Sequence, residues 1–212
     1  MKRIYLLLFL ISSISFSQNN NLIAEWKLDG NGNDSSGNNN NATKISAENA
    51  TNRNGENNKA YYFDGVNSYI DFEISNLPKG NSERTISGWF KSDISNEFSV
   101  FTNTAYTIFD YGNHSNLERF CLQIYSKAYL ETLLSDEFKN ENDFYVNNYD
   151  YLNNTWYFFT FVYNGVQTKI YSNGQLAGSK KVKLNTQSEG NKLRVGRKNN
   201  NQAESFRGTI DD

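Results

Sequence analysis

The chain has 212 residues, a length typical of one domain; 37% of them are hydrophobic, and Phe, Tyr and Trp alone make up 15%. The net charge is −2, which excludes a basic field for nucleic acid and an acidic excess for a polycationic partner. The only cysteine, Cys121, excludes an internal disulfide, and the only histidine, His114, excludes a multi-histidine zinc site.

The first residues are organised like a secretory signal peptide. Two basic residues precede an unbroken apolar run from Ile4 to Ile11, and small residues with the spacing of a cleavage site follow up to Ser17. The run is much shorter than the roughly 20 apolar residues that span a membrane. The sequence therefore predicts a signal peptide over 1–17, a short linker over 18–21, and a secreted or cell-surface protein with no membrane span after cleavage.

The mature chain begins with a pattern typical of a half-buried strand. Apolar side chains alternate with polar ones over 22–28, and turn-forming residues follow over 29–37. A polar stretch then extends to residue 58, with a short strand expected over 42–45. The segment 60–72 is expected to form two short strands around the turn at Asp64-Gly65. Further strands are expected over 85–91, 99–102, 107–111, 119–125, 129–134 and 144–146, with a helix over 133–139 as the alternative in the acidic loop.

The most strand-like stretch is the aromatic and β-branched run over 156–163. Its apolar residues occupy both parities, so we expect this strand to be covered on both faces. Asn173-Gly174 supplies the two positive-φ positions of a type I′ turn and predicts a hairpin. Strands over 193–197 and 206–211 complete the pattern. Many short strands with Gly and Asn turns predict an all-β, two-layer antiparallel sandwich or jelly roll.

Five blocks of sequence carry a family resemblance. They are Leu22-Ile23-Ala24-Glu25-Trp26-Lys27-Leu28-Asp29-Gly30-Asn31 with Asp34-Ser35-Ser36-Gly37-Asn38; Tyr62-Phe63-Asp64-Gly65 through Tyr69-Ile70; Thr85-Ile86-Ser87-Gly88-Trp89; Trp156-Tyr157 with Tyr171-Ser172-Asn173-Gly174; and Gly208-Thr209-Ile210-Asp211-Asp212. In this order they resemble the LamG-like (laminin-G-like) jelly-roll domains of the concanavalin A-like lectin/glucanase superfamily over 22–212. The resemblance implies a module that recognises a glycan or an extracellular protein, within a larger multidomain chain.

The end of the sequence departs from that resemblance. In the resembling domains the Ile-Asp-Asp block normally runs on into a last strand that pairs beside the first, whereas this sequence ends at Asp212. We therefore expect a domain that lacks its last strand because the sequence is a fragment. The alternative is a short last strand whose neighbour is an exposed edge.

Catalysis requires a carboxylate pair that the sequence does not display. Retaining glycosidases use two carboxyl groups about 5–5.5 Å apart, and the resembling glucanases place them as Glu-x-Asp-x-x-Glu or Glu-x-Asp-x-Glu. The only local echo, Glu141-Asn142-Asp143, lacks the second Glu. We predict no catalytic residue and a non-enzyme, with a glycoside hydrolase or a purely structural or adhesive domain as alternatives. Cys121 is interpreted as a structural strand residue rather than a nucleophile.

The turn-rich loop after the first expected strand suggests a cation site. An Asp-x-Asn-x-Asn pattern begins at Asp29, but Asp34 stands where an EF-hand has Gly and the twelfth position is not Glu. Resembling jelly rolls carry a structural calcium that joins this loop to the acidic residue of the last strand. The resemblance therefore implies calcium at Asp29, Asn31, Asp34 and Asp211, and the alternative is that Asp29 and Asp34 cap turns through backbone hydrogen bonds.

Strand parity selects candidate ligand contacts, because aromatic rings can stack on sugars while polar side chains bond the hydroxyl groups. Residues on the side away from the core are expected to form such a platform, although a sandwich of this size also buries many aromatics. The candidates are Trp89, Lys91, Arg119, Gln123, Tyr125 and Tyr171.

Overall fold

The computed structural model describes residues 21–93, 105–125, 129–134, 142–146, 151, 154–200 and 204–212. The predicted signal peptide and linker, the strand expected over 99–102 and most of the alternative helix over 133–139 lie outside these residues. Where the chain is described, its one helical element is the 3-10 turn Glu189–Asn191, and no helix is long and apolar enough to cross a membrane.

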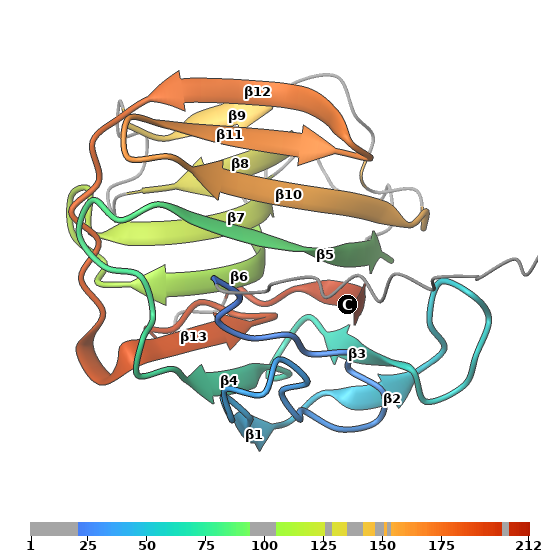
Figure 1. The fold of residues 1–212 in the computed structure, drawn as a ribbon. Coiled ribbons are helices and arrows are strands. Elements are labelled where there is room, and N and C mark those ends of the chain that lie inside the picture. The colour runs from blue at the N-terminus through green and yellow to red at the C-terminus, as the bar shows by residue number, and fades with distance from the viewer. Residues whose placement is uncertain are drawn as a thin grey trace, which may run out of the picture.

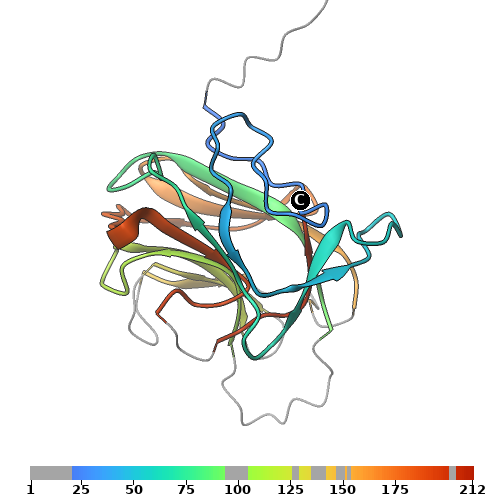
Figure 2. The ribbon, with the colours of Figure 1, turned by 90° about the horizontal axis from the view of Figure 1, so that it is seen from below.

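Two seven-stranded antiparallel sheets face each other, as predicted for a two-layer sandwich (Figure 1). The first, called the β7 sheet, has the order β1 (Ala42–Ile45), β4 (Ile70–Glu73), β13 (Lys192–Val195), β6 (Ala105–Gly112), β7 (Arg119–Tyr125), β8 (Tyr129–Leu133) and β9 (Phe144–Val146). The second, called the β5 sheet, has the order β12 (Gln175–Lys181), β11 (Gln167–Ser172), β10 (Tyr157–Tyr163), β5 (Arg84–Ser92), β14 (Arg207–Asp211), β3 (Ala60–Asp64) and β2 (Glu48–Ala50). Figure 2 shows the two curved layers from below.

Aromatic side chains from the inner faces of both sheets make the core. Phe120 of β7 stacks on Phe161 of β10 with ring centroids 4.2 Å apart and planes 1° from parallel. Phe109 of β6 packs against Phe159 and Phe161 in the same layer. Burial of each such ring contributes on the order of 1.5–3 kcal/mol, so these contacts hold the two sheets together.

The hairpin predicted at Asn173-Gly174 is confirmed. Asn173 and Gly174 have φ values of 48° and 78°, as a type I′ turn requires, and they join β11 to β12. The short strands expected over 42–45, on both sides of Asp64-Gly65, and over 119–125 and 144–146 are also found.

The prediction that 156–163 is covered on both faces is wrong. Phe159, Phe161 and Tyr163 of β10 are buried in the core, whereas Phe158 and Val162 on the other face remain partly exposed. The reason is that only one side of the β5 sheet packs against the β7 sheet. The second set of apolar side chains therefore belongs to an outer surface.

The strand predicted over 22–28 does not form. Its regular pairing is limited to an isolated bridge between Trp26 and Asp34, although Leu28 is buried and Trp26 packs on Phe72 with ring centroids 3.9 Å apart. The alternation indicates the inward side for Trp26 and Leu28, but Leu22 is 38% exposed and Ile23, of the opposite parity, packs against the core. A strand also needs a neighbour for its backbone, and this segment borders an open groove instead.

Candidate ligand-binding surface

Five side chains gather on the outer face of the β5 sheet and are called the aromatic surface. Alternation along β5, β10 and β11 turns them away from the core. All five are partly exposed. They are Trp89, Lys91, Trp156, Phe158 and Tyr171.

Cross-strand pairing brings these rings together. Trp89 of β5 lies opposite Phe158 of β10, with ring centroids 5.1 Å apart and planes inclined by 44°. Lys91 places its Nζ 5.3 Å from the ring centre of Trp156. Tyr171 pairs with Thr160 and is therefore the diagonal neighbour of Phe158 on the next strand. The result is a patch of rings that extends over three adjacent strands.

Polar groups border the aromatic surface on the side of β14. The Tyr62 hydroxyl donates to Asp93 at 2.8 Å, and Arg207 Nε lies 3.2 Å from the same carboxylate. Thr209 of β14 lies between Lys91 and Tyr62 in the register. This border therefore offers donors and acceptors next to ring faces.

An arginine covers part of the surface and links it to the end of β14. The Arg53 guanidinium lies 5.2 Å from the Trp89 ring centre and 2.5 Å from Asp211 Oδ2, and it also pairs with Asp212. A cation over one ring is worth roughly 0.5–1 kcal/mol at an exposed site. Arg53 therefore adds a cation, paired with Asp211 and Asp212, beside the Trp89 ring.

Three of the six predicted contacts lie on this surface, namely Trp89, Lys91 and Tyr171. Sequence reasoning missed Trp156, Phe158 and Arg53. The sequence predicts that Phe158 lies in a strand covered on both faces, and its parity relative to the buried Phe159 and Phe161 is the signal that places it outside. Arg53 comes from the polar loop before β3, where no local pattern marks it.

The other three predicted contacts lie on the β7 sheet and are not brought to this surface. Parity is as expected, because Arg119, Gln123 and Tyr125 of β7 point away from the core. Arg119 and Gln123 are nevertheless 0% and 2% exposed. Only Tyr125 is partly exposed, against the ring of Tyr145.

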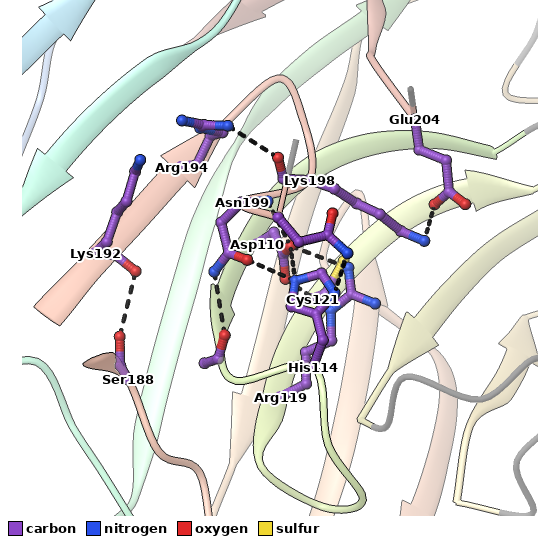
Figure 3. Close-up of polar contacts among 12 residues, drawn as sticks. Asp110, His114, Arg119, Cys121, Ser188, Lys192, Arg194, Lys198, Asn199 and Glu204 are labelled. Carbon is purple, nitrogen blue, oxygen red and sulfur yellow. Dashed lines mark hydrogen bonds and ion pairs between the residues drawn. The ribbon is translucent and has the colours of Figure 1, made fainter. Parts of the chain in front are cut away.

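A buried ionic cluster explains why Arg119 is covered (Figure 3). Its Nε and Nη2 donate to the two carboxylate oxygens of Asp110 at 2.8 and 3.0 Å. His114 Nε2 lies 3.2 Å from Asp110 Oδ2. Burial raises the pKa of Asp110, but the Arg119 charge and the hydrogen bonds of both partners outweigh it and hold the pKa well below its ordinary value.

The chain between β13 and β14 lies over this cluster. The Asn199 amide donates to Asp110 Oδ2 at 2.9 Å, Lys198 pairs with Glu204 at 2.5 Å, and Ser205 bridges to Thr107 of β6. The cluster thus fixes a covering segment over β6 and β7. Arg119 has a structural role, because its guanidinium is fully buried and donates to both carboxylate oxygens of Asp110.

The four predicted metal ligands each have protein partners. Asp34 accepts the amides of Glu25, Ser36 and Asn40 at 2.9 Å, which is the capping role considered as the alternative. Asp29 pairs with Lys59 at 3.0 Å, and Asp211 pairs with Arg53. The Asn31 side chain bonds the backbone on either side of it. Calcium would have to replace cations and amides that already neutralise these oxygens, so the arrangement does not fit a calcium ion.

No group of three or more His, Cys, Asp or Glu side chains suited to a metal occurs in the part of the chain that the structure describes. Asp143 belongs to the segment Glu141-Asn142-Asp143 that partly matches the glucanase pattern. Its carboxylate accepts a hydrogen bond from the Leu134 amide at 2.7 Å, and the residue is 8% exposed. Glu141 lies outside the described residues. Cys121 is fully buried in β7 beside Arg119, as expected for a structural residue.

The chain belongs to the concanavalin A-like lectin/glucanase superfamily. A laminin-G family model of that superfamily matches residues 63–212. No curated protein sequence matches the chain.

Solved structures with the same fold include several binding domains. The binding domain of Paraclostridial Mosquitocidal Protein 1 has a TM-score of 0.65 and 18% identity, covering 84% of this chain and 44% of that one. The receptor binding domain of botulinum neurotoxin D has a TM-score of 0.55 and 19% identity, with coverage of 84% and 45%. This chain thus spans less than half of either structure.

Domain 4 of AbnA, a GH43 extracellular arabinanase from Geobacillus stearothermophilus, was solved in complex with arabinotriose. It has a TM-score of 0.58 and 18% identity, covering 89% of this chain and 88% of that one. At such identities these similarities show the fold alone.

Proposed function

We propose that this protein is an exported, non-catalytic recognition module that binds carbohydrate on the aromatic surface of the β5 sheet. The observation that carries the proposal is the partly exposed Trp89–Phe158 pair, with ring centroids 5.1 Å apart, on the side of the sheet that does not face the core. Aromatic rings of this kind supply flat apolar area, and the neighbouring polar groups supply directional hydrogen bonds.

Mechanistically, recognition needs little rearrangement. A sugar ring would lie on Trp89 or Trp156, and its hydroxyl groups would meet Lys91 and the Asp93 carboxylate at the border. The cross-strand register fixes the spacing of these groups before a ligand arrives, which lowers the entropic cost of binding. The arabinotriose complex of AbnA domain 4 shows that one domain of this fold binds an oligosaccharide.

Two alternatives are less well supported by the described residues. Hydrolysis would need a carboxyl group that can reach a substrate. Asp143, the candidate from the sequence, is buried and accepts a hydrogen bond from a backbone amide, so it is poorly placed to act as a catalytic acid. For a purely adhesive domain without a sugar site, the partly exposed rings would contact a protein partner instead, and the glycan test below distinguishes the two cases. Export is proposed from the composition of residues 1–17, and a place in a larger multidomain chain is proposed from the family resemblance.

A glycan array followed by titration tests the proposal. We expect the protein to bind at least one oligosaccharide, and Trp89→Ala and Phe158→Ala each to weaken that binding by about two- to tenfold, since stacking contacts are worth on the order of 0.5–1.5 kcal/mol. Tyr145→Ala is the matched control, because this ring is 43% exposed on the other sheet. Equal losses for all three variants, or release of reducing sugar from a bound polysaccharide, would contradict the proposal.

A further inference from the structure

Three neighbouring strands of the β5 sheet form a basic block in a chain whose net charge is −2. Strands β10, β11 and β12 lie side by side at one edge of that sheet (Figure 1). The stretch that contains them, 151–188, has no Asp or Glu. Its cations are Lys169, Lys180, Lys181 and Lys183. The sequence therefore places cations and no acid on three adjacent strands.

Two of these lysines lie on the same outer face as the aromatic surface. Lys169 has the parity of Tyr171 on β11 and alternates with buried neighbours. Lys181 of β12 lies opposite Gln167, which has the same parity as Lys169. Together with Lys91 of β5 they place three cations on this face, and these three are called the lysine row.

The ammonium groups of the lysine row have no carboxylate partner in the part of the chain that the structure describes. Other lysines do have one, since Lys59 pairs with Asp29 at 3.0 Å and Lys192 pairs with Asp71 at 2.9 Å. The charges of the lysine row are therefore available to an anion from outside.

The acids next to the aromatic surface do not cancel this positive charge. Asp93 lies 3.2 Å from Arg207 Nε, and Asp211 pairs with Arg53, so each carboxylate has a cation of its own. Glu83 precedes β5, two strands from β11, which is about 10 Å and exceeds the Debye length of about 8 Å at physiological ionic strength. The excess of cations thus belongs to the side of β10, β11 and β12.

The lysine row extends along the aromatic rings. Lys91 lies at the level of Trp156 on β10, and Lys169 lies at the level of Val162. Six residues of an extended strand span about 20 Å. Phe158 lies between these two levels, and Tyr171 pairs with β10 between them as well. This length and this mixture of rings and cations suit a chain of sugar rings that carries anionic groups along it.

We propose that the aromatic surface recognises an anionic oligosaccharide. Its sugar rings lie on Trp89, Phe158 and Tyr171, and its carboxylate or sulfate groups bond to the lysine row. The inference rests on the proposed function, because the rings supply the sugar contacts, and it adds the chemical class of the ligand. On binding, Lys91 exchanges its contact with the Trp156 ring for a charge-assisted hydrogen bond, which is stronger than a neutral one. Charges at such a surface supply specificity and a faster association.

Titration with three galactose-based oligosaccharides of equal length tests the class of ligand. The probes are an oligogalacturonate, which carries carboxylates, an oligocarrageenan, which carries sulfates, and a neutral galactan oligomer. We expect one or both acidic probes to bind at least tenfold more tightly than the neutral one. Their affinity should fall several-fold between about 0.05 M and about 0.5 M salt, because salt screens exposed charges. The tighter acidic probe identifies the anionic group.

Neutral substitutions separate the charges from the rings. Lys91→Gln, Lys169→Gln and Lys181→Gln should each weaken binding of the tighter acidic probe by about threefold. The triple variant should lose about tenfold or more, with little change for the neutral probe. The matched control is Lys44→Gln, because Lys44 is exposed on the β7 sheet and also lies over a ring, 4.8 Å from the centre of Tyr69.

The outcomes distinguish this inference from the proposed function. Equal affinity for acidic and neutral probes, or equal losses in Lys44→Gln and in the lysine-row variants, would overturn the anionic ligand and leave sugar recognition in place. Absence of binding by both acidic probes at millimolar concentration would overturn the inference whatever the neutral probe does. If polyglutamate bound as tightly as the better acidic probe, and Phe158→Ala weakened neither, the sugar rings would have no part in recognition and both proposals would fail.

Discussion

Trp89 and Phe90 are consecutive residues of β5 with opposite environments. Phe90 is 0% exposed and contacts four other aromatic rings of the core, whereas Trp89 lies on the outer face between Phe158 and Arg53. Alternation along one strand therefore separates a residue buried in the core from a residue on the outer face, where we propose that a ligand binds.

Substitution of these two neighbours should separate stability from binding. We expect Phe90→Ala to lower the free energy of unfolding by about 3–5 kcal/mol, and Trp89→Ala by about 1–2 kcal/mol because its ring is partly solvated. Urea unfolding measures both. A larger loss of stability in Trp89→Ala than in Phe90→Ala would show that Trp89 serves packing rather than recognition.

How much of the candidate site could be predicted depends on which relationships are local. The residues beside Trp89, Lys91 and Tyr171 in their own strands predict that these three lie on an outer face, and the structure agrees. The neighbouring residues of Arg119 and Gln123 could not predict that these two belong to the other sheet. Strand order is set by long-range pairing, which puts β5 between β10 and β14 and puts β7 between β6 and β8. The covering of Arg119 depends on a segment almost 80 residues away in the chain.

A carboxylate in the β3–β4 turn should make stability depend on acidity. Asp64 accepts the amides of Val66, Asn67 and Ser68 at 2.8–3.0 Å, and these bonds outweigh burial and lower the pKa of Asp64 to about 2. A lowered pKa in the folded state gives stability that is complete above about pH 4 and is lost as the pH falls towards 2.

We therefore expect Asp64→Asn to destabilise the protein by about 1 kcal/mol at pH 6 and by less at pH 2.5. The free energy of unfolding of both proteins, measured at the two pH values, checks this. A difference that stays constant between them would mean that the charge of Asp64 does not matter.

The fold was predictable wherever a strand carries its own pattern. The limits of β7 agree with its alternation to the residue, those of β9 agree with the predicted strand, and the Asn173-Gly174 turn follows from positive φ values that these two residues tolerate. The segment 22–28 shows the limit of such reasoning. Trp26 and Leu28 lie inward as the pattern requires, whereas Leu22 is exposed and Ile23 packs against the core. Strand hydrogen bonding also depends on a neighbour that no local pattern reports.

Cys121 should be inert in the folded protein. Burial raises the pKa of its thiol well above the ordinary value despite the nearby Arg119, and the side chain is 0% exposed. A thiol reagent needs the thiolate and access to it, so we expect labelling to proceed only as fast as the protein unfolds. Labelling in native buffer and in urea gives the two rates, and rapid native labelling would contradict the burial.

Removal of calcium should not change the melting temperature. The oxygens of Asp29, Asp34 and Asp211 are already bonded to Lys59, to backbone amides and to Arg53. Thermal unfolding with added calcium and with excess chelator measures the effect. A midpoint lowered by the chelator would establish the calcium site that the family resemblance implies, because binding to the folded state alone raises stability.

The buried Asp110–Arg119 pair offers the sharpest contrast with an exposed one. Asp110→Asn leaves the Arg119 guanidinium charged and 0% exposed, so we expect a loss of about 3–5 kcal/mol in the free energy of unfolding. The matched control is Asp29→Asn, which breaks the exposed pair with Lys59, whose side chains are 43% and 38% exposed; there we expect about 0–1 kcal/mol. The double variant Asp110→Leu/Arg119→Met removes both charges and should be less destabilised than Asp110→Asn, because no isolated charge stays buried. If the double variant were the less stable of the two, the packing of these side chains rather than their charge would hold the covering segment on β6 and β7.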